Sequence, residues 1–209
     1  IFVRRAHGGE TIKVIDGSEH TLTTENLVIA DAVSAVAVAG VIGGAKAEVS
    51  DSTEMILLES ATFVAPNIRR TAASLKTRTE ASTRFEKGLT SDLAIEALRR
   101  ATKLLTEISA GTADADFIDV HQNPVSQNPI MLSHDHLTRV LGADLRPDEV
   151  TTPLRALGFC VDALERSYMV TAPYWRSDLV IAEDGAEEVA RIIGYDNLPR
   201  KFLQGSIPS

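Results

Sequence analysis

Cysteine is almost missing from this sequence, and its scarcity limits the chemistry that the chain can perform. Cys160 is the single cysteine among 209 residues. An internal disulfide and a cysteine-rich zinc site are therefore both excluded. A reducing cytoplasm is the simplest compartment for such a chain.

Long hydrophobic runs are also lacking. The longest, residues 35–42, is far shorter than the roughly 20 residues that cross a bilayer. No basic segment followed by an apolar stretch and a cleavage site indicates a signal peptide. Apolar residues make up 44% and charged residues 24% of the chain, which is typical of globular domains. We therefore expect a cytoplasmic protein without a membrane partner.

Charge is spread unevenly along the chain, whose net charge is −8. Residues 1–110 hold 14 acidic and 13 basic side chains, whereas residues 111–209 hold 15 acidic and 8 basic ones. One stretch of the first part is rich in basic side chains: Arg69, Arg70, Lys76, Arg78, Arg84, Lys87, Arg99, Arg100 and Lys103. This stretch could contact phosphates, although solvated helix faces would give the same pattern.

The first half predicts a mostly antiparallel sheet, because short apolar runs alternate with turns. The expected strands cover residues 1–5, 11–15, 27–30, 35–39 and 55–58. Asp16-Gly17 predicts a hairpin turn after the second strand. Since the chain opens in the middle of a strand, we expect it to be an internal fragment.

Helical patterns follow this sheet. Pro66 favours a helix over residues 67–75. Ser91 is a candidate N-cap for a long helix that ends near Ser109. Its apolar residues repeat at helical spacing, and we expect that stripe to be core.

The segment 123–129 predicts a linker, because it holds two prolines and two asparagines. It divides the chain into domains 1–123 and 124–209. In the second domain we expect two helices, the first opened by Ser133 and the second by Pro147. A hairpin over residues 159–172 and a last helix over residues 183–193 should follow. We expect Trp175 to be a core anchor before that last helix. The predicted fold is therefore α+β: a mostly antiparallel sheet with packed helices, then a small helix-helix-hairpin-helix domain.

Four segments carry a family resemblance: residues 39–44 (AGVIGG), 57–61 (LLESA), 78–88 (RTEASTRFEKG) and 187–196 (EEVARIIGYD). In this order and spacing they are similar to the β subunit of bacterial-type phenylalanyl-tRNA synthetases. The match covers the tRNA-editing domain of that family, over residues 1–123, and the small domain that follows it.

The resemblance implies a part of phenylalanine-tRNA ligase, which charges tRNA(Phe) with phenylalanine using ATP. The implied partners are tRNA(Phe) and the ATP-using α subunit, a separate chain of an α2β2 heterotetramer. The family's pocket also includes a histidine-containing motif that would precede Ile1. We therefore expect this stretch alone not to aminoacylate, and to edit poorly or not at all.

The implied editing reaction hydrolyses tyrosine wrongly attached to tRNA(Phe), because an apolar amino-acid pocket cannot strongly reject an added hydroxyl. The resemblance assigns recognition of the phenol to Glu59, a pocket-lining turn to Gly43 and the shape of the pocket beside the ester to Thr79. Without the resemblance, these residues would be a solvated strand end, an ordinary turn and a helix cap. No nucleophile-base pair is apparent, so we expect a positioned water to attack, with the tRNA itself as a candidate helper.

A second constellation is acidic. Asp184, Glu187 and Glu188 fall on one helix face, and Asp178 lies just before that helix. Their mutual repulsion would be relieved by a hard cation. The resemblance implies magnesium at the α-subunit border, and a solvated acidic face is the alternative. Gly185 stands where a bulkier residue is typical of the family.

The alternative to the editing function is a non-hydrolytic tRNA-binding or subunit-assembly module. The acidic charge of the second domain argues against phosphate as its main partner and favours subunit docking there.

Overall fold

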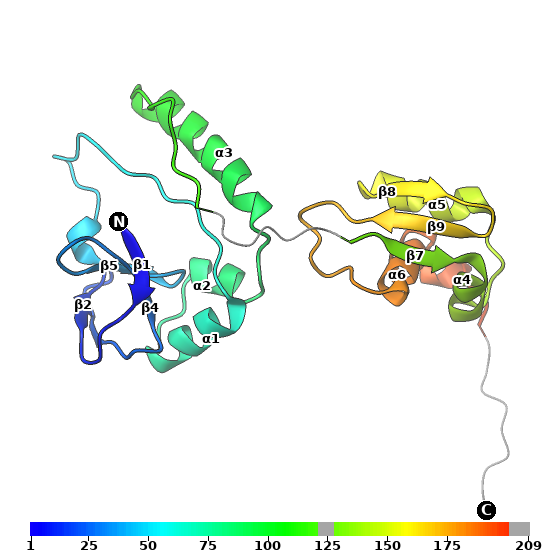
Figure 1. The fold of residues 1–209 in the computed structure, drawn as a ribbon, viewed down its shortest axis with the longest axis horizontal. Helices are drawn as coiled ribbons and strands as arrows, with labels where there is room; N and C mark the ends of the chain where they lie inside the picture. Colours follow the sequence, from blue (N-terminus) through cyan, green and yellow to red (C-terminus); the bar gives the residue numbers. More distant parts are fainter. Residues whose placement is uncertain (121–127, 201–209) are drawn as a thin grey trace, which may run out of the picture. The chain divides into compact units, whose positions relative to one another are not determined.

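The computed structural model describes residues 1–120 and 128–200. The chain divides into two compact units, Ile1–Pro124 and Val125–Ser209 (Figure 1). Most of the linker predicted over residues 123–129 lies outside the described residues. The α+β class is confirmed in both units, because each combines antiparallel strands with separate helices.

The first unit begins with strands and ends with helices. Its elements are β1 (Phe2–Arg5), β2 (Thr11–Lys13), β3 (Glu19–Thr21), β4 (Leu27–Ala30), β5 (Ala35–Val38), β6 (Ile42–Gly43), the 3-10 turn η1 (Ala45–Ala47), α1 (Ala65–Ser74), α2 (Glu80–Phe85) and α3 (Asp92–Ser109). One antiparallel sheet has the order β1-β4-β5-β6, and β2 pairs with β3 in a hairpin.

The predicted hairpin turn is confirmed. Gly17 has a φ of 87°, which glycine adopts without steric cost. The Asp16 carboxylate accepts a hydrogen bond from the Ser18 amide at 2.8 Å and so closes the turn. The hairpin and the sheet bury Val14, Val28 and other aliphatic side chains against α1.

Helix α1 supplies the other half of this core. Pro66 lies in its first turn, where the missing amide hydrogen leaves no intrahelical bond unmade. Ile68 and Ala72 are four residues apart and both are buried against the sheet. The helix predicted over residues 67–75 is confirmed.

Three expectations for this unit were wrong. Residues 55–58 form no strand, and Met55 is 90% exposed, because no strand within the described residues pairs with this run. Ser91 does precede α3, which ends at Ser109 as predicted, but its side chain makes no capping hydrogen bond, since its backbone is already helical. The stripe of α3 is not core: the helix has no buried residue and Ile108 is 82% exposed, because no described element covers it.

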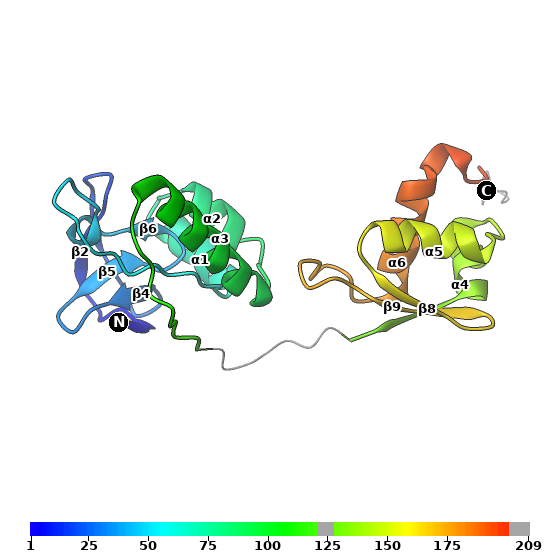
Figure 2. The same cartoon turned by 90° about the horizontal axis from the view of Figure 1, so that it is seen from above.

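The second unit is a three-stranded sheet with helices on one face (Figure 2). Its elements are β7 (Ile130–Ser133), α4 (His134–Leu141), α5 (Pro147–Ala156), β8 (Cys160–Ala163), β9 (Ser167–Thr171), α6 (Ala182–Ile193) and the 3-10 turn η2 (Tyr195–Asn197). The strand order is β7-β9-β8, so β7, which the sequence did not predict, extends the expected hairpin. The Ser133 hydroxyl caps α4 as expected, accepting from the His136 amide at 3.1 Å.

A closed apolar core fills the second unit. Leu132, Tyr168 and Val170 alternate along β7 and β9 and are buried against Val150 and Val189 of the helices.

Trp175 was wrongly expected in this core. It is 50% exposed and stacks edge-on with Tyr174 over Gly158, at the border of the core rather than inside it. Within the described residues, no helix combines the length and the apolar character that a bilayer span requires.

Candidate functional site

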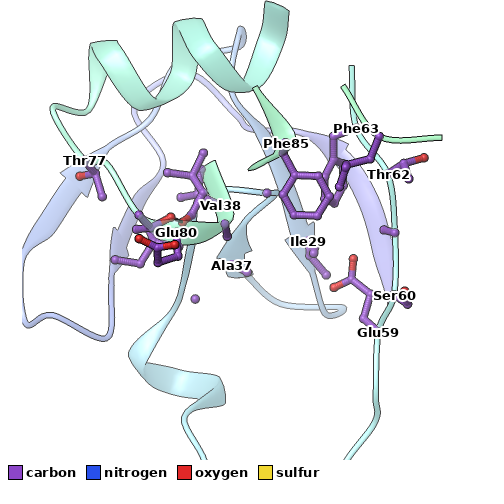
Figure 3. A pocket seen from close by; sticks show the side chains of 18 of the residues that line it. Ile29, Ala37, Val38, Glu59, Ser60, Thr62, Phe63, Thr77, Glu80 and Phe85 are labelled. Atoms are coloured by element: carbon purple, nitrogen blue, oxygen red, sulfur yellow. Dashed lines mark hydrogen bonds between the residues drawn. The ribbon is translucent and has the colours of Figure 1, made fainter. Parts of the chain in front are cut away.

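A solvent-open cleft of about 1090 Å³ lies in the first unit (Figure 3). Strands β4, β5 and β6, the segment 59–63, the loop 76–79 and the first turns of α2 and α3 contribute to its lining. The structure brings together the three residues that the sequence singled out, since Glu59, Gly43 and Thr79 all line this cleft. They come from segments that are far apart along the chain.

Glu59 lies on the extended segment that precedes α1. Figure 3 shows its carboxylate pointing toward Ile29, on the side of the cleft where Phe63 and Phe85 lie. Burial by these surroundings raises the pKa of the Glu59 carboxyl above its ordinary value, although the residue keeps a solvent-exposed surface. Within the described residues no cation pairs with it. An acidic group held in apolar surroundings without a counter-ion is available to a ligand.

Two phenylalanines form an aromatic wall of the cleft. The Phe63 and Phe85 rings pack edge to face with centroids 5.0 Å apart. Gly40 backs this wall: it has a φ of 67°, and a Cβ there would lie 2.8 Å from the Phe63 ring. No sequence pattern predicted a role for these three residues. Gly40, as the first glycine of the AGVIGG motif, was the one signal in the sequence that could have indicated this wall.

Thr79 holds two walls of the cleft together. Its hydroxyl donates to the Val41 carbonyl at 2.6 Å and accepts from the Ser82 amide at 3.0 Å, while the Ser82 hydroxyl accepts from the Thr79 amide. This capping box starts α2, and the Val41 bond fixes the helix start to the β5–β6 turn. The hydroxyl proton is therefore already used. Only an oxygen lone pair of Thr79 remains for a water or a substrate.

Adjacent glycines of the β6 turn have different roles. A Cβ on Gly44 would lie 2.6 Å from the Val36 carbonyl oxygen, so only glycine fits there. A Cβ on Gly43 would meet only Ile15 Cγ2, at 3.7 Å, which is ordinary contact. Gly43 lines the cleft, and the absence of its side chain leaves space for a ligand.

Neither histidine nor cysteine is found among the described residues that line the cleft. The polar groups of the lining are carboxylates, hydroxyls and the cations Lys76 and Arg78. This set can orient a ligand and a water molecule. It does not form a nucleophile activated by a neighbouring base.

The four expected magnesium ligands are arranged differently. Arg176 donates to both carboxylate oxygens of Asp178, at 2.9 and 2.8 Å, and to Glu188 at 2.6 Å. The second carboxylate oxygen of Glu188 accepts from Arg191. Burial alone would raise the pKa of Glu188, but the hydrogen bonds from the two arginines lower it overall. Arg176 likewise lowers the pKa of Asp178.

The remaining two carboxylates do not complete a metal site. Asp184 accepts hydrogen bonds from the amides of Val180 and Ile181, at 2.8 and 2.9 Å, and so caps α6, and Glu187 is exposed. In the part of the chain that the structure describes, no three His, Cys, Asp or Glu side chains are grouped as metal ligands. As arranged here, these residues do not fit a magnesium ion.

Comparisons with known proteins divide the chain as the structure does. A family model for the B3/4 domain matches residues 1–110, and one for the tRNA synthetase B5 domain matches residues 130–195.

Relatives resemble nearly the whole chain. It is 44% identical over 95% of its length to a phenylalanine–tRNA ligase beta subunit of Salinibacter ruber and 41% identical, also over 95%, to one of Bacillus licheniformis. A beta subunit of Dehalococcoides mccartyi is 40% identical over 100% of the chain. The matches cover 24%, 25% and 27% of these relatives, so the chain spans about a quarter of their length.

Proposed function

The chain belongs to the B3/4 domain family, and from this we propose that it is a stretch of the β subunit of a phenylalanine–tRNA ligase whose cleft hydrolyses mischarged Tyr-tRNA(Phe). The relatives confirm the resemblance to these β subunits that the sequence predicted. The observation that carries the editing role is the cleft itself. It combines an apolar, partly aromatic wall with one carboxylate that has no counter-ion among the described residues.

Recognition of tyrosine follows from the state of Glu59. A phenol entering the cleft would donate a hydrogen bond to the carboxylate, whereas the ring of phenylalanine would leave that carboxylate without a partner. An unmade hydrogen bond of this kind costs about 1–3 kcal/mol. The cleft thereby selects the hydroxyl that the aminoacylation site cannot strongly reject.

Hydrolysis would use a positioned water. Thr79 lines the cleft, holds the start of α2 against the β5–β6 turn and keeps one oxygen lone pair unused. Gly43 leaves space for the ester beside that turn. The protein contributes orientation and electrostatics, and the tRNA hydroxyl next to the ester can assist the water.

Deacylation of Tyr-tRNA(Phe) by the intact heterotetramer tests this proposal, with the 209-residue chain assayed beside it. We expect Glu59→Ala to slow hydrolysis of Tyr-tRNA(Phe). Thr79→Val should slow it as well, and Thr79→Ser should retain activity because serine can make both hydrogen bonds. Unchanged hydrolysis in Glu59→Ala and Thr79→Val would refute the editing role. Binding of tRNA(Phe) without any deacylation would favour a non-hydrolytic module instead.

We propose that the second unit is a docking domain for the α subunit. Apolar side chains that remain exposed before α6 support this role: Trp175 is 50%, Val180 70% and Ile181 53% exposed. The test is co-purification with the α subunit, which Val180→Asp should reduce. Magnesium at this border stays a prediction for the assembled enzyme, since Asp178 and Glu188 would have to release Arg176 first.

A cytoplasmic location is also part of the proposal. It is supported by the single cysteine, which suits a reducing compartment. ATP belongs to the reaction of the α subunit.

A further inference from the structure

Lys76 has an unusual backbone conformation directly after α1. Its φ is 53°, in the left-handed region, and Ala110 is the other non-glycine residue with a positive φ among those described. The Lys76 amide donates to the Ala73 carbonyl at 3.2 Å and the Thr77 amide to the Ala72 carbonyl at 3.0 Å. These two bonds form a Schellman motif, which ends the helix.

The motif explains the left-handed backbone but not the lysine. Glycine is the usual residue at this position because it has no Cβ to clash. A cation near a helix C-terminus is favourable, but a lysine in the last turn would provide the same charge with an unstrained backbone. Glycine would form the same motif without strain, and a non-glycine residue kept in this conformation is typical of functional positions.

Lys76 also lines the cleft. It is exposed, and across residues 1–120 and 128–200 its ammonium has neither an ion pair nor a hydrogen bond. The neighbouring cation Arg78 pairs with Glu86 at 3.3 Å. In Figure 3, Thr77 and Glu59 lie on opposite sides of the cleft, so the chain next to Lys76 borders the side away from the carboxylate.

An aminoacylated nucleotide also has two chemically different ends, as the two sides of the cleft do. Its side chain is at one end, and the phosphate that links the terminal nucleotide to the strand is at the other. On the basis of the proposed function, we infer that Lys76 binds a backbone phosphate of the RNA strand whose aminoacylated end enters the cleft. A phenol at Glu59 and a phosphate at Lys76 would then fix both ends of the substrate, with the ester between them.

Affinity of the 209-residue chain for a tRNA(Phe) transcript, measured by fluorescence anisotropy over a range of salt concentrations, tests this inference. Lys76→Asn keeps a residue that tolerates the left-handed backbone but removes the charge, and Lys76→Gly also removes the strain. We expect both to weaken binding several-fold. The slope of log K against log salt should fall by about 0.7–0.9, the loss of one phosphate contact. Lys76→Arg should keep the slope.

Thermal melting of the same proteins provides the second readout. Lys76→Gly should melt at a higher temperature than the wild type while binding less well, an opposition that a purely structural lysine would not produce. Lys87→Asn is the matched control, because Lys87 is exposed and lies outside the cleft lining.

The inference is overturned if the Lys76 variants bind with the wild-type slope, if Lys87→Asn weakens binding equally, or if the wild-type chain does not bind the transcript. Failure of the editing proposal is separate, since it would appear as unchanged deacylation in the Glu59 variant.

Discussion

Two carboxylates, Glu59 in the first unit and Glu188 in the second, are in opposite electrostatic states. Glu59 lies in the cleft with no counter-ion among the described residues, and burial raises the pKa of its carboxyl. Glu188 is 7% exposed and accepts hydrogen bonds from Arg176 and Arg191. The first carboxylate is available to a ligand, whereas the second is already satisfied within the fold. Burial and acidity alone therefore do not identify a ligand site.

Removing Arg176 should have the largest effect, because it leaves Glu188 buried with only one of its two partners. We expect Arg176→Met to lower the free energy of unfolding by about 2–4 kcal/mol. Urea unfolding followed by the fluorescence of Trp175, the single tryptophan, reports on the second unit directly.

Arg166→Met is the control for this prediction, since the Arg166–Asp135 pair is exposed and screened by solvent and should contribute little to stability. Equal losses of unfolding free energy in the two variants would show that Arg176 does not stabilise the buried Glu188.

The adjacent glycines of the cleft provide the next comparison. Gly44→Ala should cost about 2 kcal/mol or more, because the new Cβ would collide with the Val36 carbonyl oxygen. Gly43→Ala should change stability by less than about 0.5 kcal/mol, since its Cβ has room. Circular dichroism melts distinguish the two variants. If Gly43→Ala were the more damaging one, the assignment of Gly43 to ligand space would be wrong.

A smaller effect is expected at Gly185 in the core of the second unit. A Cβ there would lie 2.8 Å from Leu132 Cδ2, and Leu132 is fully buried. Overpacking should outweigh the gain of about 1 kcal/mol in helix propensity, giving a net loss of about 1 kcal/mol for Gly185→Ala. A raised melting temperature would mean that the core adapts to the methyl group.

The smallest effect concerns the pH dependence of Glu59. Its raised pKa means that the folded state keeps the proton over a range in which the unfolded chain releases it. The resulting stability is present at low pH and is lost as the pH rises from about 4.5 through the folded-state pKa. Glu59→Gln has no carboxyl to titrate and should not lose this stability. In denaturant titrations, the free energy of unfolding of the variant relative to that of the wild type should therefore rise between pH 4 and pH 7. Glu54→Gln, on the exposed stretch before it, is the control.

Patterns confined to one element were predicted well from the sequence. Pro66 at the start of α1, Ser133 at the cap of α4 and Gly17 in the hairpin turn each act through neighbouring residues, so the local sequence is sufficient.

Failures arose where the outcome depends on a partner elsewhere in the chain. Residues 55–58 have strand composition but no strand beside them, and the apolar stripe of α3 has no described element over it. Arg176 was missed as the partner of Glu188 because nothing in the sequence shows that the loop before α6 returns across that helix. Only Glu59, Gly43 and Thr79 of the cleft were found through motif resemblance, and the bond from Thr79 to Val41 required the fold.

The central claim is that Glu59 selects a phenolic aminoacyl group, and ligand binding tests it most directly. Affinities of tyrosinamide and phenylalaninamide for the 209-residue chain should be compared by calorimetry in the wild type and in Glu59→Ala. We expect the wild type to prefer tyrosinamide by about 5- to 150-fold, the equivalent of a hydrogen bond worth about 1–3 kcal/mol, and the variant to lose that preference. Equal affinities in the wild type, or a preference that survives in Glu59→Ala, would contradict the account.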